Sequence, residues 1–271
     1  MLFNRARRLV PIFVLSLLAA SSVQSAGALF QEPTCLSSSE QIISDRSDIS
    51  ISVNVVPQGS LQIDNGLGWT SGQGSQTVDG PQTTLRAGVA HCTEAILDLP
   101  DYSSGVRGTA TSGFSPLELA AKRQLFRLPG AVNISAEAGL GLPVANHTGS
   151  CNGYESFVQI SWNRQLGNYW SANGMVAFSW FSGQSSCSAT LEPTFALSRT
   201  FGTDKRLLVE YVGEFARHGP PGQFINAGGL YRLTRTQLVW FRFGFGFTAA
   251  APDEYFGLGY TFRLDELFRT P

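Results

Sequence analysis

Apolar and polar residues alternate one by one along much of this chain, in stretches of about ten residues separated by turn residues. In the clearest stretch, 239–247, every odd-numbered position is Val or Phe, whereas the even-numbered positions are Trp240, Arg242, Gly244 and Gly246. Successive side chains of a β-strand point to opposite faces, so this strand presents one wholly apolar face. The sequence predicts mostly strands of this kind, and patterns typical of helices are nearly absent beyond the first residues.

The alternation and the turn residues together predict about twelve strands. These strands are expected at 59–70, 83–90, 94–101, 113–125, 131–142, 154–165, 169–181, 190–200, 206–216, 223–233, 236–247 and 254–264. Tight turns alternate with longer connections, which fall near 71–82, 102–112, 143–153, 182–189, 217–222 and 248–253. Bacterial outer-membrane barrels show this interleaving, with short turns and both chain ends in the periplasm.

Composition separates a membrane barrel from a soluble β-sandwich, which also alternates but needs a charged exterior. Only 14% of the residues are charged, while 11% are aromatic and 29 are Gly. We therefore predict an all-β fold, a transmembrane antiparallel β-barrel over residues 58–271, in the bacterial outer membrane with lipid around it. The net charge of −1 provides no basic excess for phosphates, so nucleic acid is not an expected partner.

The N-terminal residues predict export. Arg5, Arg7 and Arg8 precede a short apolar run and then small residues, so residues 1–25 are expected to be a cleaved signal peptide. The run is too short to span a membrane as an anchor. Residues 26–57 are rich in Ser and do not fit the barrel pattern. We expect them to form a periplasmic N-terminal extension, with 49–56 as a candidate for an additional short strand.

Four cysteines in an exported chain indicate disulfides rather than metal ligands. Cys151 and Cys187 fall in predicted outer loops, whereas Cys35 and Cys92 fall on the periplasmic side. Any other pairing would span the membrane, far beyond the ~7 Å Cα separation that a disulfide allows. The expected pairs are Cys35 with Cys92 and Cys151 with Cys187, and free thiols are the alternative.

Isolated charges on the inward faces are the candidate functional residues. The candidates for a constriction are Glu137, Glu210, Glu214, Arg232, Arg242 and Arg263. We expect an acidic residue of strand 206–216 to pair with the arginine of one of the next two strands and to narrow the pore. The alternative is that these charges pair only to fill and stiffen a small lumen.

An outer-membrane enzyme is a further alternative, because some barrels modify lipids. Only His91, His147 and His218 could act as a histidine base, and none lies on a strand beside a lipid-facing serine. No catalytic residue, cofactor or metal site is therefore expected. A structural or adhesion barrel without a pore is the third possibility.

The second half of the chain resembles a known family. From Leu207 to Leu264 it carries a Glu-bearing strand, the motif G-x-Y-x-L at 229–233, an aromatic strand and D-x-x-x-G-x-G-x-x-F at 253–262. In this order the motifs resemble the outer-membrane transporters grouped as the MetA-pathway phenol-degradation family. Earlier strands are similar too, so the resemblance extends over 59–264. One departure is that the chain continues beyond Phe262 instead of ending on an aromatic residue of the last strand.

The resemblance implies a small barrel that passes small compounds, often aromatic or apolar, and it supplies no catalytic residue. We therefore expect a monomeric, porin-like channel or transporter for a small-molecule solute. During biogenesis its expected partner is the barrel-assembly machinery.

Overall fold

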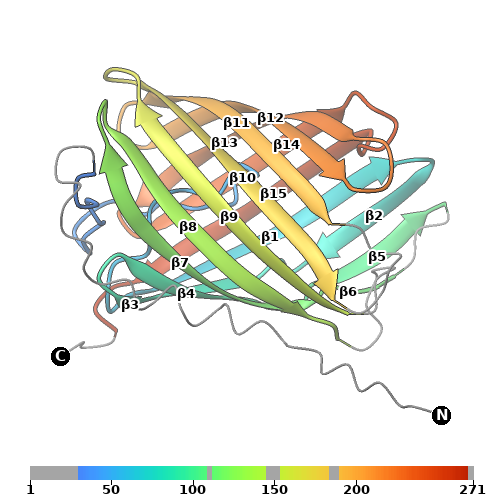
Figure 1. Cartoon of the computed structure of the whole chain (residues 1–271), viewed down its shortest axis with the longest axis horizontal. Coiled ribbons are helices and arrows are strands. Elements are labelled where there is room, and N and C mark those ends of the chain that lie inside the picture. Colours follow the sequence, from blue (N-terminus) through green and yellow to red (C-terminus); the bar gives the residue numbers. More distant parts are fainter. Residues whose placement is uncertain (1–29, 109–111, 145–152, 183–188, 268–271) are drawn as a thin grey trace, which may run out of the picture.

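The computed structural model describes residues 30–108, 112–144, 153–182 and 189–267, and it is an all-β barrel of tilted antiparallel strands (Figure 1). The predicted signal peptide, residues 1–25, lies outside these described residues. The strands are β1 (Leu61–Gly72), β2 (Ser75–Gly80), β3 (Thr84–Ala90), β4 (Thr93–Asp98), β5 (Tyr102–Arg107), β6 (Gly113–Phe114), β7 (Leu117–Leu128), β8 (Val132–Leu142), β9 (Tyr154–Gln165), β10 (Trp170–Ser182), β11 (Thr190–Phe201), β12 (Lys205–Ala216), β13 (Gly222–Thr234), β14 (Gln237–Gly246) and β15 (Glu254–Leu264).

These segments form one sheet that closes through pairing of β1 with β15. Three strands of the barrel are interrupted, so that β2 runs on into β3, β4 into β5, and β6 into β7. Each interruption contains a proline, at Pro81, Pro100 and Pro116, and proline has no N–H to donate to a strand ladder. With each interrupted pair counted once, twelve strands close the barrel, as predicted.

Two connections expected to be loops are partly strand. β2 lies within the predicted connection 71–82 and β5 within 102–112, and the two pair with each other. They lengthen one part of the wall beyond the predicted strand ends. The alternation is interrupted by Gly80 and Pro81, which is why this part of the sequence resembles a loop.

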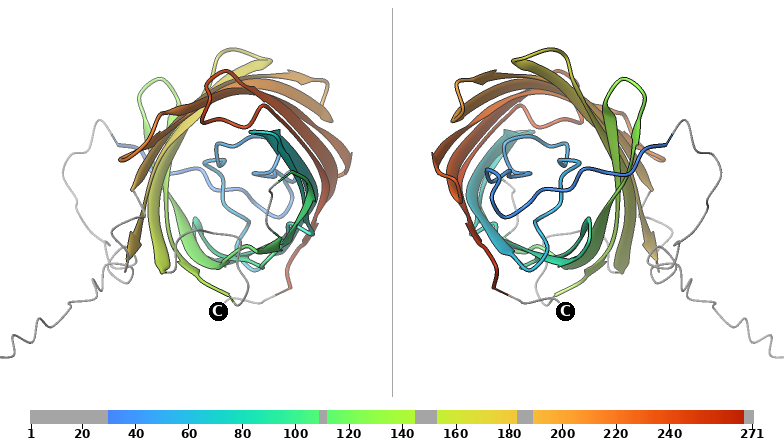
Figure 2. Two further views of the ribbon diagram at one scale, coloured as in Figure 1. Left: turned by 90° about the vertical axis from the view of Figure 1, so that its right-hand side faces the viewer. Right: turned by 90° about the vertical axis from the view of Figure 1, so that its left-hand side faces the viewer.

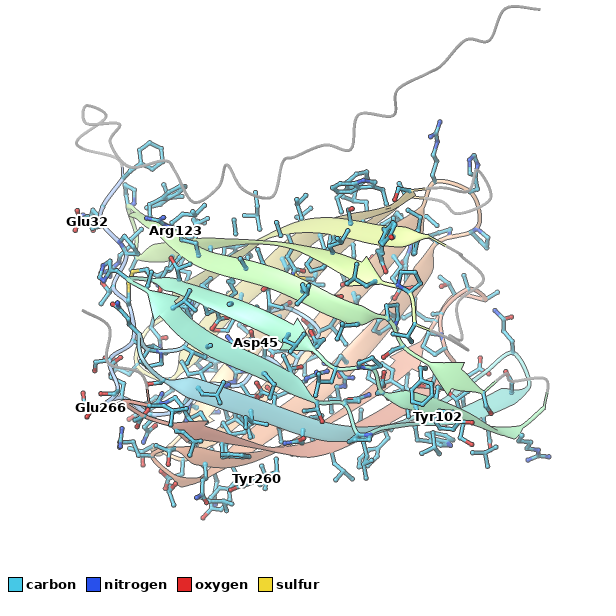
Figure 3. All side chains as sticks on the ribbon, turned by 90° about the horizontal axis from the view of Figure 1, so that it is seen from below. Glu32, Asp45, Tyr102, Arg123, Tyr260 and Glu266 are labelled. Atoms are coloured by element: carbon cyan, nitrogen blue, oxygen red, sulfur yellow. A yellow bond between two sulfur atoms is a disulfide. The ribbon has the colours of Figure 1, made fainter. Side chains whose placement is uncertain are left out.

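The outer surface of the barrel is apolar. On β14 the outward side chains Val239, Phe241, Phe243 and Phe245 each expose 38–47% of their surface. Figure 3 shows Tyr260 on the outside of the wall and Asp45 enclosed within it. An exposed apolar belt of this extent needs lipid around it, because it would be costly in water. The fold and its belt place the protein in the outer membrane.

Within the described residues, no helix is both long enough and apolar enough to cross a membrane.

The N-terminal segment lies inside the barrel, where Figure 2 shows it as a blue chain within the ring of strands. It starts at the rim that carries the short turns, where Gln31 bridges to Arg127, and returns to that rim, where Gln58 bridges to Gly88. This end of the barrel is called the short-turn rim below. Between these points, Ile42 is 0% exposed and Val53 1%.

Residues 42–56, called the plug below, therefore occupy the lumen instead of extending into the periplasm as expected. The candidate strand at 49–56 is irregular chain. An eight-stranded barrel is filled by its own side chains, whereas about twelve strands leave room for such a segment.

Candidate functional site: the plugged lumen

The plug is held first by a buried cluster of four charges. The Asp45 carboxylate accepts a hydrogen bond from Lys122 Nζ at 2.8 Å and forms an ion pair with Arg86 Nη1 at 3.1 Å. Both cations also contact Glu94 Oε1, at 2.7 Å from Arg86 Nη2 and 3.4 Å from Lys122 Nζ. Lys122 and Glu94 are fully buried. Burial acts to raise the pKa of Asp45, but the charges of Arg86 and Lys122 hold this pKa below its ordinary value.

Two further ion pairs join the plug to opposite walls. Arg46 contacts Asp98 on β4 at 3.1 Å, and both side chains also contact the hydroxyl of Thr84. Asp48 contacts Arg206 on β12 at 3.1 Å. Burial raises the pKa of Asp48 to about 6, against the opposing effect of Arg206. The tip of the plug is therefore fixed between strands that face each other across the lumen.

Glu210, about halfway along β12, binds the backbone of the plug. Its carboxylate accepts hydrogen bonds from the amides of Ile49 and Ser50, each at 2.8 Å, and it also contacts the Ser50 hydroxyl. Asn226 of β13 donates to the same carboxylate at 2.9 Å. Glu210 is completely buried. A buried carboxylate needs several donors, and the plug supplies most of them.

The predicted pairing of Glu210 or Glu214 with Arg232 or Arg242 is wrong, because no such ion pair occurs among the described residues. The strand register explains the difference. Glu210 lies opposite Asn226 and Glu214 opposite Gly222. Inward-facing residues of neighbouring strands meet only where the register brings them to the same height.

The three arginines of the candidate constriction have separate roles. Arg232 and Arg263 lie near the short-turn rim and donate to backbone carbonyls of the N-terminal segment, Arg232 Nε to Ile42 at 3.1 Å and Arg263 Nη2 to Glu40 at 2.9 Å. Arg242 lies against the rings of Trp240 and Tyr255, at 5.9 and 6.0 Å from their centres. The first two therefore anchor the segment, and Arg242 faces the open lumen.

A disulfide ties the start of the N-terminal segment to the wall. Cys35 and Cys92 are bonded, with Cα atoms 5.4 Å apart, which confirms this predicted pair. Cys92 belongs to the turn between β3 and β4 at the short-turn rim. The other predicted pair, Cys151 with Cys187, lies outside the described residues. The plug is thus covalently attached at one end and continuous with β1 at the other.

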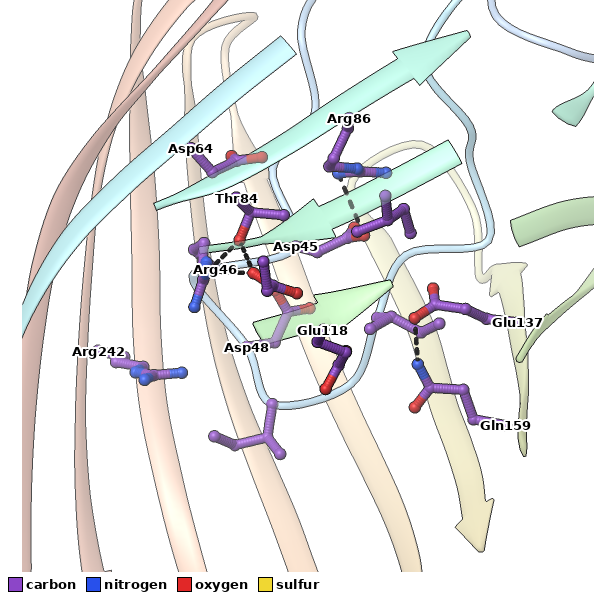
Figure 4. Close-up of a pocket in the computed structure, with 14 residues that line it drawn as sticks. Asp45, Arg46, Asp48, Asp64, Thr84, Arg86, Glu118, Glu137, Gln159 and Arg242 are labelled. Atoms are coloured by element: carbon purple, nitrogen blue, oxygen red, sulfur yellow. Dashed lines mark hydrogen bonds and ion pairs between the residues drawn. The ribbon is translucent and has the colours of Figure 1, made fainter. Parts of the chain in front are cut away.

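Beyond the plug, the lumen contains three neighbouring cavities, and Figure 4 shows the residues that line the first of them. The first has a volume of about 290 Å³ and includes Asp98, Glu118, Glu137, Gln159 and Arg242 in its lining, together with the plug tip. Two more, of about 210 and 240 Å³, share Glu118 with it.

On the other side, a cavity between the plug and the wall has a volume of only about 10 Å³. A space of that size is at the lower limit for one water molecule. The plug therefore packs closely against the wall here, on the side of the short-turn rim.

Ion pairs and hydrogen bonds hold the middle of the plug, and the sequence analysis predicted only the residues on the barrel side of these contacts. The inward faces were predicted correctly, but the partners supplied by the plug, among them Asp45, Asp48 and Ser50, were missed. One signal was present in the sequence. Residues 44–50 contain three Ser, two Asp and one Arg in a segment that lacks barrel alternation, and buried wall charges such as Lys122 need partners from elsewhere in the chain.

Comparison with solved structures shows the same fold in outer-membrane channels. The COG4313 outer membrane channel from Pseudomonas putida F1 has a TM-score of 0.62 and 13% identity, covering 83% of this chain and 100% of that chain. The NanC porin has a TM-score of 0.57 and 9% identity, covering 74% and 100%. The KdgM porin has a TM-score of 0.50 and 12% identity, covering 74% and 98%.

No curated protein sequence matches the chain. A family model does match, and its match begins within the plug and runs through the last strand. The model is described as "Putative MetA-pathway of phenol degradation" and covers residues 44–264, so the chain belongs to that family.

Proposed function

We propose that the protein is an outer-membrane channel for small solutes, which the plug closes in the conformation of Figure 2. The observation that carries the proposal is the set of ion pairs and hydrogen bonds that hold residues 45–50 of the plug in the lumen. The apolar contact of Ile42 with Leu230, Leu238 and Trp240 lies at the start of the plug, beside the turn between β13 and β14. Ion pairs and hydrogen bonds can be exchanged for water at a modest net cost, whereas a packed apolar core cannot. A segment held in this way can leave the lumen while the barrel stays closed.

The cavity lining supports a small solute with both polar and apolar parts. Ile49, Ile51 and Ile96 line the first cavity beside its charged residues. An aromatic or apolar body could pack against the isoleucines while a polar group meets the charges. Such a solute agrees with the aromatic and apolar compounds that the family description suggests.

We further propose that the protein acts as a monomer. Pairing of β1 with β15 closes the sheet, so the barrel has no free edge strand that would need a second copy. Lipid would contact the apolar belt, and the barrel-assembly machinery would insert the chain during biogenesis.

Solute flux into liposomes tests the channel function. In the variant Glu210→Gln, the neutral amide accepts hydrogen bonds from the plug more weakly, so docking should weaken by about 1–3 kcal/mol and flux should rise. Glu214→Gln is the matched control, because residue 214 lies on the same strand and face with no ion pair to the plug. Flux that stays at the protein-free level in wild type and in Glu210→Gln alike would contradict a channel.

A further inference from the structure

Carboxylates gather along one wall of the lumen above the plug. They come from one side of the barrel and are Asp98 on β4, Glu118 on β7, Glu137 on β8, Glu155 on β9 and, beyond β10, Glu192 on β11. Asp98 lies directly opposite Glu118 in the strand register. Glu118 lines all three cavities. These five residues are called the carboxylate wall below.

The carboxylate wall is mostly without cationic partners. Among the described residues, Asp98 alone of the five forms an ion pair, with Arg46 of the plug. In the plug cluster, by contrast, Asp45 and Glu94 are matched by Arg86 and Lys122. The other cation that lines the first cavity, Arg242, contacts aromatic rings and forms no ion pair in the described structure. The open part of the lumen therefore carries more carboxyl groups than cationic groups.

Glu137 is a second, independent observation that points to a ligand of the carboxylate wall. Its side chain is only 6% exposed and lines the first cavity. One carboxylate oxygen, Oε1, accepts a hydrogen bond from Gln159 at 2.8 Å, whereas Oε2 is buried and has no hydrogen-bond partner. A buried carboxylate oxygen without a donor is costly. A cation in the cavity would remove that cost.

We propose that the carboxylate wall binds a small organic cation that carries ammonium groups. This inference rests on the proposed function and specifies its substrate class. An ammonium group offers three N–H donors, which suits oxygens presented by several strands about 4.8 Å apart. The hydrocarbon part of the solute would lie against Ile49 and Ile51 of the plug and Ile96 of β4.

A bare metal ion fits the carboxylate wall less well. Calcium needs several oxygen atoms at about 2.3–2.6 Å, so its ligands must lie close together. Within the described residues, the group of three donor atoms that lies within 4.8 Å is Cys35, His91 and Cys92, which belongs to the short-turn rim. The carboxylates are spread along the wall instead, as an extended amine would require.

Calorimetry on the full-length protein in detergent tests the inference without requiring an open channel. The probes are the diamine putrescine, its uncharged analogue butanediol and the dianion succinate. We expect putrescine to bind and the other two not to bind measurably. Glu118→Gln and, separately, Glu137→Gln should each lower the affinity for putrescine about tenfold or more, which is the effect of losing one charge-assisted hydrogen bond.

Two further variants separate charge from a general disturbance of the fold. Glu118→Asp keeps the negative charge and should bind putrescine more tightly than Glu118→Gln. Glu254→Gln removes an exposed carboxylate from β15, outside the three cavities, and should bind as wild type does. Butanediol binding as tightly as putrescine, or equal putrescine affinity in wild type, Glu118→Gln and Glu137→Gln, would overturn the inference.

The two proposals fail in different ways. Putrescine binding without solute flux in any variant would support the amine site and contradict the channel function. Solute flux without putrescine binding would support the channel function and contradict the amine site.

Discussion

Single glycines on the inner face determine how closely the plug can approach the wall. At Gly228 of β13, a Cβ atom would lie 2.1 Å from the carbonyl oxygen of Ser47. At Gly88 of β3, it would lie 2.1 Å from the carbonyl oxygen of Pro57. No side chain fits at either position, so the backbone of the N-terminal segment contacts the wall directly.

The variant Gly228→Ala should displace the plug, because its methyl group would overlap the Ser47 carbonyl. We expect faster proteolysis within residues 42–56 and higher solute flux, with the barrel still folded. Gly141→Ala is the control, since the nearest atom to its Cβ would be a side-chain carbon of Glu155 at 3.3 Å. Equal protease resistance in wild type and Gly228→Ala would show that this contact does not seat the plug.

Neighbouring residues of β10 test which face meets lipid. Val176 is 50% exposed on the outside, whereas Ala177 lines the 240 Å³ cavity and pairs with Glu192 across the strands. Val176→Arg should destabilise the barrel by about 2–4 kcal/mol, the cost of a charge at mid-membrane. Ala177→Arg should cost less, because its charge would meet water and a carboxylate. Reversible unfolding in lipid vesicles measures both, and a larger loss for Ala177→Arg would reverse the assigned faces.

At the scale of elements, the strands could be predicted from sequence and the plug could not. Alternation is a local signal, and it identified the strands and their inward faces. It does not give the height of each residue in the barrel, which depends on register. Glu210 was therefore placed on the correct face but paired with the wrong partners.

The plug depends on contacts between distant parts of the chain. The Ile49 amide and the Glu210 carboxylate are 161 residues apart in sequence. No periodic pattern marks such a contact, because each partner is satisfied only when the whole barrel has closed around the segment. The disulfide was predictable because topology limited which cysteines could meet.

The disulfide should restrain the plug more than it stabilises the barrel. Cys35 and Cys92 are 57 residues apart in sequence, and their bond attaches the start of the N-terminal segment to the turn between β3 and β4. Because β1 and the other strands pair without it, the variant Cys35→Ser, Cys92→Ser should keep the barrel's thermal stability nearly unchanged. Hydrogen exchange within residues 42–56 should become faster. Loss of the barrel itself would show that the bond supports the wall instead.

The whole molecule combines a closed lipid-facing barrel with an internal segment, the plug, that occupies part of the lumen. The wall has no free edge, and the plug is anchored at both ends to one rim. The barrel can therefore stay intact while the plug moves. Under the proposed function, passage of a solute depends on one rearrangement, the departure of residues 42–56 from the charged residues of the wall that hold them.

A disulfide that locks the plug to the wall tests directly whether solute passes only when the plug moves. The hydroxyls of Ser50 and Thr194 are in hydrogen-bond contact between the plug and β11, so the variant Ser50→Cys, Thr194→Cys should form a disulfide across that contact. Solute flux into liposomes is then compared before and after reduction, with wild type under the same reductant as the control. We expect the oxidised variant to pass less solute than wild type, and reduction to restore its flux. Equal flux through the oxidised and reduced variant would contradict this expectation.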